Sequence, residues 1–188
     1  MAAPGGTGPI GPFPSEVGDD PDAKAEYDRR RRRVLWSFPS GLFIVGSREG
    51  DRRNGMTLNW FTQVSFDPKL VAISVEETAF THELIAGGRS FTVNTVDRED
   101  RAIVRKFTKP VEVDTAARTL NGFPYHDGPA TGAPVLDQAP AFLECEVRQE
   151  VDCGDHTLFV GEVVNIGFQK DEETPVLRME DTRMNYGG

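Results

Sequence analysis

The sequence predicts a mostly β fold, a closed or half-open antiparallel barrel with a few short helices. Three observations lead to this prediction. At least six segments of the chain are short, apolar and rich in β-branched residues. Turn signals separate most of them, as in hairpins. The segments with helical character are too few and too short for the alternating βαβ units of a doubly wound sheet.

Composition limits the class of protein. The chain has 188 residues, 38% of them hydrophobic, which suits one domain with a sizeable core. A net charge of −9 disfavours nucleic acid or an anionic membrane as a partner, and a phosphate-bearing ligand would need a local group of cationic donors. We see no secretory leader, no apolar run near the ~20 residues of a membrane span, and no disulfide framework, so we expect a cytoplasmic protein.

The N-terminal part divides into an arm and a helix. Residues 1–21 are rich in glycine and proline without periodicity, so we expect a flexible arm, followed by a single domain over residues 22–188. An arm that wraps a partner subunit is the alternative, suggested only by Ile10 and Phe13. Good helix formers fill Ala23–Trp36, and Asp20 or Asp22 can cap the helix.

Five consecutive arginines, Arg29–Arg33, lie in this helix. Such a run can bind nucleic acid or act as a nuclear-localisation signal. The simpler interpretation is a solvated helix face whose arginines pair with Glu26 and Asp28, and the acidic total charge favours it.

Strands dominate the rest of the chain. Turn-forming residues separate most of them, and the last two alternate strongly around the short sequence DCGDH, which indicates a long hairpin. The predicted strands are Gly41–Gly50, Asn54–Ser65, Leu70–Glu76, Ser90–Val96 and the two arms of the hairpin within Ala141–Gln169.

Two short helices and a turn-rich segment complete the prediction. The first helix lies within Thr78–Gly88, with Thr78 or Thr81 as its cap and Gly87 as its stop. The second lies within Arg98–Thr108, and residues 109–138 form turns.

The strand Asn54–Ser65 has two unlike faces. Because side chains alternate along a strand, one face carries Met56, Leu58, Trp60 and Val64, and the other carries Thr57, Asn59, Gln63 and Ser65. The second face has short uncharged hydrogen-bonding groups in place of lysine and glutamate. It suits a flat ring with polar edges, although ordinary solvent-facing residues remain the alternative.

Two other stretches have residues suited to ligand chemistry. Thr78 and Thr81 at a helix N-terminus, with Lys106 or Lys109 further on, could bind an anion, or the threonines could simply cap the helix. His156 follows an aspartate between two glycines, where it could donate a hydrogen bond or position a hydride donor, or be purely structural.

Several common sites are absent from the sequence. His82, His126 and His156 lie too far apart to indicate a metal-binding pair. The chain contains no GxSxG, no Walker loop and no GxGxxG, so a nicotinamide cofactor would not be held by a Rossmann phosphate loop.

Five stretches in the right order resemble the flavin reductase-like family, the FMN-binding split barrels. FPSGLFIVGS is similar to the first strand of that family, and NGMTLNWFTQVSFDPKLVAISVE to its flavin-binding strand, turn and following strand. FTVNTV and GDHTLFVGEV resemble two further strands, and the terminal MNYGG resembles the closing aromatic-glycine stretch. The resemblance covers residues 34–188.

The resemblance implies a homodimeric, six-stranded antiparallel split β-barrel of Greek-key type with flavin near the subunit interface. It implies hydride transfer from NADH or NADPH to FMN, with FAD as the other possible flavin, and it allows a flavin-dependent monooxygenase as partner. Two alternatives stay open: an FMN-holding protein that reduces another acceptor, and a flavin- or haem-binding carrier without turnover.

The resemblance also implies a set of site residues. Those along the flavin ring and ribityl chain are Thr57, Leu58, Asn59 and Trp60, with Gln63 and Ser65 nearby. Those towards the phosphate are Thr81, His82, Lys106 and Phe107. His156 is the catalytic candidate, with Tyr186, on the nicotinamide side. Trp60 and Gln63 replace residues that are small in many family members.

Overall fold

The computed structural model describes residues 10–184. Its larger sheet has the strand order β2-β1-β5-β10-β11-β4-β3, and every neighbouring pair is antiparallel. The strands are β1 Phe43–Glu49, β2 Arg52–Leu58, β3 Phe61–Ser65, β4 Leu70–Glu76, β5 Ser90–Thr95, β10 Ala141–Asp152 and β11 His156–Phe168.

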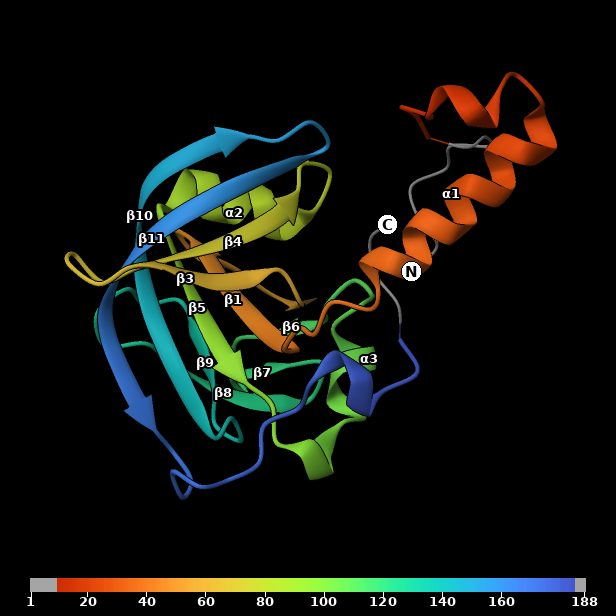
Figure 1. Cartoon of the computed structure of the whole chain (residues 1–188). Coiled ribbons are helices and arrows are strands. Elements are labelled where there is room, and N and C mark those ends of the chain that lie inside the picture. Colours follow the sequence, from red (N-terminus) through yellow and green to blue (C-terminus); the bar gives the residue numbers. More distant parts are fainter. Residues whose placement is uncertain (1–9, 185–188) are drawn as a thin grey trace.

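This sheet curls into a barrel (Figure 1). Strands β2 and β3 lie at opposite ends of the strand order, but only Asn59 and Trp60 separate them in the chain. The two sheet edges therefore meet at these residues, and β2 and β3 act as one broken strand of a six-stranded barrel. The connection from β4 to β5 passes over two strands, as in a Greek key. The predicted antiparallel barrel is confirmed.

The prediction of one continuous strand over Asn54–Ser65 is wrong. Leu58 is 5% exposed, whereas Trp60 and Val64, predicted on the same buried face, are 38% and 51% exposed. The physical reason is a change of partner: up to Leu58 the chain pairs with β1, and from Phe61 it pairs with β4. The alternation restarts at the break.

Helix α2 (Phe80–Gly88) follows the prediction in position but not in its caps. The N-cap is Ala79, without a side-chain hydrogen bond, so neither predicted threonine caps the helix. Gly87 does not end it, because the helix continues to a left-handed Arg89 with φ 56°. A Cβ at Gly88 would collide with the carbonyl oxygen of Arg48, so the glycine allows close packing on β1.

The segment after β5 is more regular than predicted. In place of one helix, a 3₁₀ turn (Arg98–Asp100) precedes the short helix α3 (Ile103–Lys106). The predicted turn segment contains a small antiparallel sheet, which Figure 1 places beside the barrel. Its strands are β6 Val113–Asp114, β7 Thr119–Leu120, β8 Phe123–Asp127 and β9 Pro134–Leu136.

Residues 10–184 form two hydrophobic cores, one on each side of β1. Val45 packs inside the barrel with Phe91 and Phe159, and the adjacent Ile44 packs outside with Phe107 and the small sheet. Each core removes apolar surface from water, the main stabilising term in folding.

Buried polar groups link these layers. The Asn94 amide donates to the carbonyl of Ile44 (3.0 Å) and accepts from the N–H of Leu136 (2.9 Å), which ties β9 to the barrel wall. The asparagine of the FTVNTV stretch therefore has a structural role.

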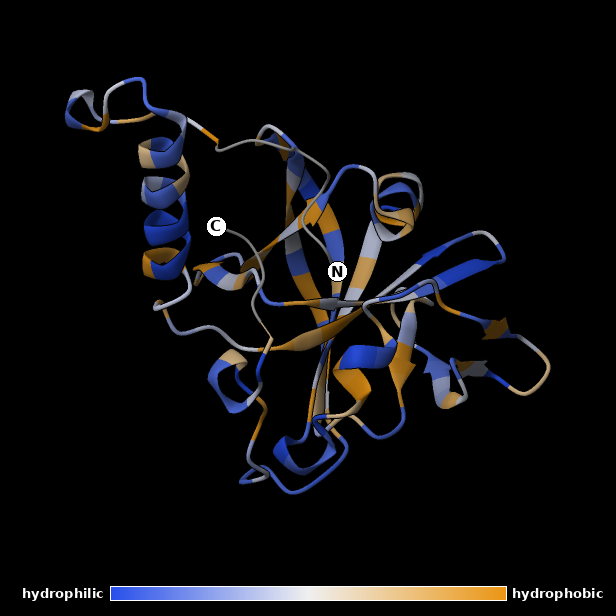
Figure 2. Ribbon diagram, turned by 90° about the vertical axis from the view of Figure 1, so that its right-hand side faces the viewer, coloured by the Kyte–Doolittle hydropathy of each residue, from blue (hydrophilic) through white to orange (hydrophobic). Residues whose placement is uncertain are grey.

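Helix α1 (Pro21–Leu35) stands away from the barrel (Figures 1 and 2). Asp20 caps it by accepting from the N–H of Asp22 at 3.2 Å. Arg29 pairs with Glu26, and Arg31 pairs with Asp28, as expected for a solvated face. Within residues 10–184, no helix is long and apolar enough to cross a membrane.

Candidate functional site

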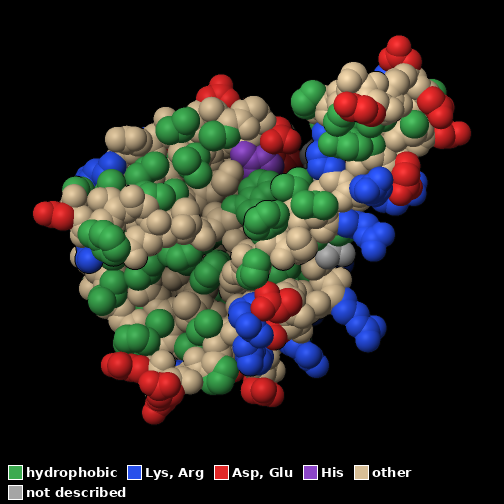
Figure 3. Space-filling view, viewed as in Figure 1, with side chains coloured by type: hydrophobic (Ala, Val, Ile, Leu, Met, Phe, Trp, Pro, Cys, Tyr) green, Lys and Arg blue, Asp and Glu red, His purple; other side chains and the backbone are tan. Residues whose placement is uncertain are grey.

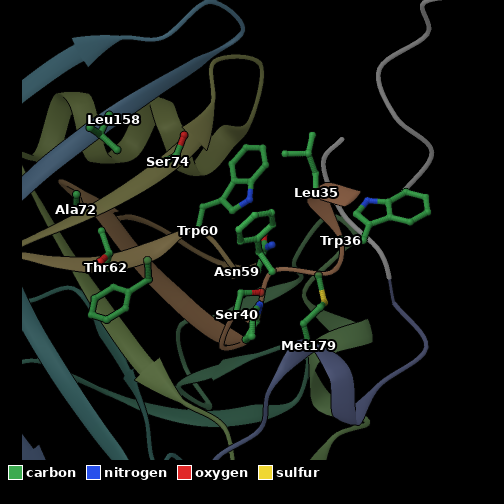
Figure 4. A pocket seen from close by; sticks show the side chains of 13 residues that line it. Leu35, Trp36, Ser40, Asn59, Trp60, Thr62, Ala72, Ser74, Leu158 and Met179 are labelled. Atoms are coloured by element: carbon green, nitrogen blue, oxygen red, sulfur yellow. The ribbon is translucent and has the colours of Figure 1, made fainter. Parts of the chain in front are cut away.

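Two cavities meet beside the break between β2 and β3. The first, of about 420 Å³, lies between the end of α1 and the barrel; the second, of about 80 Å³, runs along the end of β2. Both are lined by Asn59, Ser74 and Met179. Figure 4 shows Trp60 and Leu35 extending toward one another across the first cavity. We call this region the Trp60 end.

The second cavity continues into a basin beside α3. Thr108 and Met184 line both the narrow cavity and a basin of about 880 Å³, and Arg105 and Arg183 line both this basin and a further one of about 590 Å³. One groove therefore runs from Trp60 past Thr57 to α3. The two basins form its basic end, with the cationic side chains Arg101, Arg105, Lys106, Lys109 and Arg183.

The charges of the basic end are not neutralised locally. Within residues 10–184, none of its five cationic side chains forms an ion pair. Three carboxylates also line it. Asp181 is engaged by Arg98 at 3.1 Å, and hydrogen bonding from Arg178 lowers its pKa. Glu180 pairs with Arg178 at 3.0 Å, whereas Glu112 forms no ion pair within residues 10–184, so five cationic side chains face one unpaired carboxylate. In a chain of net charge −9, this is a local positive region suited to an anion.

The junction of the two cavities offers uncharged hydrogen-bonding groups. Asn59 is 8% exposed, and neither its amide nor the Ser74 hydroxyl forms a side-chain hydrogen bond with another described residue. A buried amide normally has a partner, so these two side chains are available to a ligand.

Thr57 lines the same groove, but its hydroxyl and its N–H already form hydrogen bonds within the fold. Its hydroxyl donates to the carbonyl of Val104 (2.6 Å), and its N–H donates to the carbonyl of Phe107 (3.0 Å). A hydroxyl has one hydrogen to donate, so in this arrangement Thr57 can only accept from a ligand. The same bonds tie the end of β2 to α3, and hence the Trp60 end to the basic end.

His156 lies behind Trp60. The two rings are 4.9 Å apart at 57°, and the imidazole is 9% exposed. His156 Nδ1 lies 2.6 Å from the Asp155 carboxylate, which can only accept, so Nδ1 carries the hydrogen. This fixes the tautomer and ring orientation beside the groove.

No metal site is found in the described part of the chain. No three side chains of the metal-binding types come together there. Both cysteines are free thiols, and burial raises the pKa of Cys145 to about 12.

A groove with hydrogen-bonding side chains at one end, where Glu76 is the one carboxylate of the described residues that lines the two cavities, and a basic region at the other agrees with the family to which the sequence is similar. The model of the flavin reductase like domain matches residues 35–187. The chain belongs to this family. Helix α1 precedes the matched region almost entirely.

Known flavin reductase-like proteins share both sequence and fold with this chain. The NADH-dependent FAD reductase of Streptomyces globisporus is 35% identical over 136 residues, which are 71% of this chain and 72% of that enzyme. The structure of the Streptomyces globisporus NADH:FAD oxidoreductase SgcE6 with NAD and FAD fragments superposes with a TM-score of 0.71 at 28% identity, over 88% of this chain and 94% of that one.

Some relatives are longer. The reductase component of the flavin-dependent trigonelline monooxygenase of Acinetobacter baylyi is 28% identical over 138 residues, and this chain spans 43% of it. That match covers 73% of the present chain.

The structure brings only part of the predicted flavin site together. The predicted residues that line the groove are Thr57, Leu58, Asn59, Trp60 and Lys106. Tyr186 lies outside the described residues.

Five predicted flavin contacts do not line the groove. Gln63 and Ser65 lie on the edge strand β3, where the Gln63 amide donates to the Ser65 carbonyl (3.0 Å). The other three pack within the fold: Thr81 accepts from Asn54 (2.8 Å), His82 Nε2 lies 2.8 Å from the hydroxyl of Thr157, and Phe107 is 1% exposed. Their contact with flavin stays a prediction.

Sequence reasoning missed other residues of the groove. Ser74 is the only hydroxyl in the apolar strand Leu70–Glu76, a signal that could have been used. Arg105 is adjacent to the predicted Lys106, but Arg183 and Leu35 come from distant segments and gave no signal.

Proposed function

We propose that the protein is an NAD(P)H-dependent flavin reductase, whose groove binds a flavin nucleotide with its ring at the Trp60 end and its phosphate at the basic end. The observation that carries this proposal is the continuity of the groove. It connects available uncharged groups to cationic side chains that have no ion pair within residues 10–184.

The side chains fit the chemistry of a flavin. Asn59 and Ser74 offer an amide and a hydroxyl to the polar edge of the ring, and apolar Leu58, Met56 and Met179 line the walls beside them. Arg105, Lys106 and Lys109 match a phosphate group, which arginine and lysine bind with charge-assisted hydrogen bonds.

The bound flavin supplies the redox chemistry, by accepting a hydride from the nicotinamide. The protein supplies orientation and exclusion of water. Trp60 and Leu35 narrow the first cavity and keep water from the ring, and Asn59 and Ser74 orient its polar edge. His156, held by Asp155, positions the nicotinamide and is not required as a proton donor.

The size of the basic end favours FAD as the flavin. FMN carries one phosphate, which the basin of about 880 Å³ accommodates with room to spare. The adjoining basin of about 590 Å³ adds Arg101 and the apolar side chain of Met184, which suit the second phosphate and the adenosine of FAD. Its two carboxylates, Asp181 and Glu180, are held by Arg98 and Arg178. FMN, the flavin first expected, would use the nearer basin alone.

The activities of the related proteins suggest the electron donor and the partners of this protein. We propose NADH as the donor, a homodimer as the assembly, and delivery of reduced flavin to a separate monooxygenase. The open mouth of the groove supports flavin exchange, because a substrate must enter and leave. Figure 3 shows hydrophobic side chains around this mouth at the base of α1.

The test is anaerobic rapid mixing of the protein and excess FAD with NADH, followed by flavin absorbance at about 450 nm. We expect many flavins to be reduced per protein chain, faster than without protein. Reduction of a single equivalent would indicate a tightly held flavin that serves another acceptor. No reduction with NADH or NADPH would overturn the proposal and leave a binding protein.

A further inference from the structure

Helix α1 is a basic arm on an acidic protein. It contains six basic residues (Lys24 and Arg29–Arg33) and three acidic ones (Asp22, Glu26, Asp28), a net charge of +3. The chain as a whole has −9, so the remainder has −9 − 3 = −12. Arg30 and Arg33 are exposed and form no ion pair within residues 10–184.

The helix has little support from the barrel. Its 15 residues extend about 22 Å, and Figures 1 and 2 show it directed away from the barrel. The preceding residues fold back on it, with the rings of Phe13 and Tyr27 6.1 Å apart. A helix that is polar all round commonly bridges to another surface.

The base of the helix exposes apolar side chains. Val34, Leu35 and Phe38 are 60%, 51% and 69% exposed, within five residues of the sequence. A group of exposed apolar side chains that lie together on a surface indicates an interaction site. The arm therefore presents cations followed by an apolar base, directly beside the mouth of the groove.

A surface of opposite character lies on the same chain. Glu77 and Asp155 are neighbours through a backbone hydrogen bond of 3.1 Å, and Asp152 lies opposite Thr157 in the β10–β11 hairpin. Within residues 10–184, none of these three carboxylates pairs with a lysine or arginine; Asp155 contacts His156. Val151, next to Asp152 in the sequence, is 42% exposed and adds apolar surface. Phe80, 46% exposed, has the Arg52 guanidinium over its ring at 5.7 Å. We call this surface the hairpin tip.

We propose that α1 is an arm exchanged between two copies of the chain, with Arg30 and Arg33 of one protomer on the hairpin tip of its partner. This rests on the homodimer of the proposed function and specifies how it is built. Both complementary surfaces belong to one chain and neither is satisfied within its described part. A two-fold symmetric pair satisfies each of them twice, which is the usual geometry of a homodimer.

The exchange has a consequence for the groove. The hairpin tip carries Asp155, which orients His156, and Leu35 at the base of the arm lines the first cavity. The exchange therefore places the arm of one protomer next to the Asp155–His156 pair of the other.

The test uses two charge-reversed variants and their mixture. Variant one is Arg30→Glu with Arg33→Glu, and variant two is Glu77→Arg with Asp152→Arg. We measure the dimer dissociation constant by sedimentation equilibrium. Each variant alone brings like charges together, so we expect its dissociation constant to rise about tenfold or more. The mixture pairs opposite charges at both contacts, so heterodimers should form within about threefold of native affinity.

The controls separate this contact from general charge effects and from the proposed function. Lys69→Glu with Arg118→Glu makes the same charge change at exposed positions elsewhere, and should leave dimerisation unchanged. Unchanged dimerisation of variant one, or no preference for heterodimers, would overturn the exchange. A native protein that is monomeric would also overturn it. The same holds if variant one loses only the ability to bind nucleic acid. Flavin reduction is measured on the same samples, once their far-UV circular dichroism spectra show that they are folded. If the samples reduce flavin, the proposed function stands, whether or not the dimer forms by arm exchange.

Discussion

The two ends of the groove are built from different kinds of structure. At the Trp60 end, Ser74 projects from β4, which is paired on both sides, and Asn59 lies in the two-residue break between β2 and β3. At the basic end, Arg105 and Lys109 extend from a four-residue helix and the loop after it. Orienting a ring requires fixed groups, whereas attracting a phosphate requires charge near the right place. The fold is rigid where direction matters and relies on long side chains where charge matters.

Reversing charge at the basic end should have the largest effect. Arg105→Glu with Lys109→Glu removes two charge-assisted contacts, so we expect the KM for FAD to rise about 100-fold. Riboflavin lacks a phosphate, and its KM should stay within about twofold. Steady-state reduction of the two flavins at saturating NADH measures both values. Lys69→Glu is the control, and an equal loss for riboflavin would show that the basic end does not act on phosphate.

Removing the imidazole at the Trp60 end should affect the donor and spare the flavin. His156→Ala should lower kcat/KM for NADH about tenfold, the equivalent of one lost hydrogen bond or contact of about 1.4 kcal/mol. Flavin affinity, measured by fluorescence quenching, should change less than about threefold. His126→Ala, at an exposed histidine 2.7 Å from Asp137, is the matched control. The prediction fails if His156→Ala loses flavin but reduces it normally when flavin is resupplied.

A smaller change at the junction should affect all flavins alike. Ser74→Ala removes one neutral hydrogen bond, so we expect about fivefold weaker binding of FAD, FMN and riboflavin. Ser15→Ala changes the same residue type at an exposed position outside the groove and should have no effect. Equilibrium titration of the three flavins makes the comparison, and a loss confined to FAD would contradict the assignment of the ring to this end.

The link between the two ends should give the smallest effect. Thr57→Val removes the bond to the Val104 carbonyl, and we expect the free energy of unfolding to fall by about 1 kcal/mol and the KM for FAD to rise about threefold. Thr57→Ser keeps the hydroxyl and should restore most of both. Urea unfolding and flavin kinetics measure them, and unchanged stability would mean that the bond to α3 contributes nothing.

The sequence predicted the parts of the site that depend on local pattern. The barrel strands and long hairpin follow from alternation and turn residues, and Asn59 and Lys106 lie in the groove as expected. The break at Asn59–Trp60 could not be predicted, because alternation does not reveal which strand is the partner. The role of Arg183 depends on the path of the last segment, and Phe107 is an aromatic residue that the outer core uses.

The break between β2 and β3 also limits how the gene can vary. Asn59 and Trp60 are the only residues between two strands whose registers are fixed by β1 and β4. Inserting or deleting one residue there would turn every following side chain of β3 to the opposite face, or pull Asn59 from the groove. Point substitutions are open to selection at this position, but changes of length are not, whereas the exposed turn at Gly50 can lengthen without moving the groove.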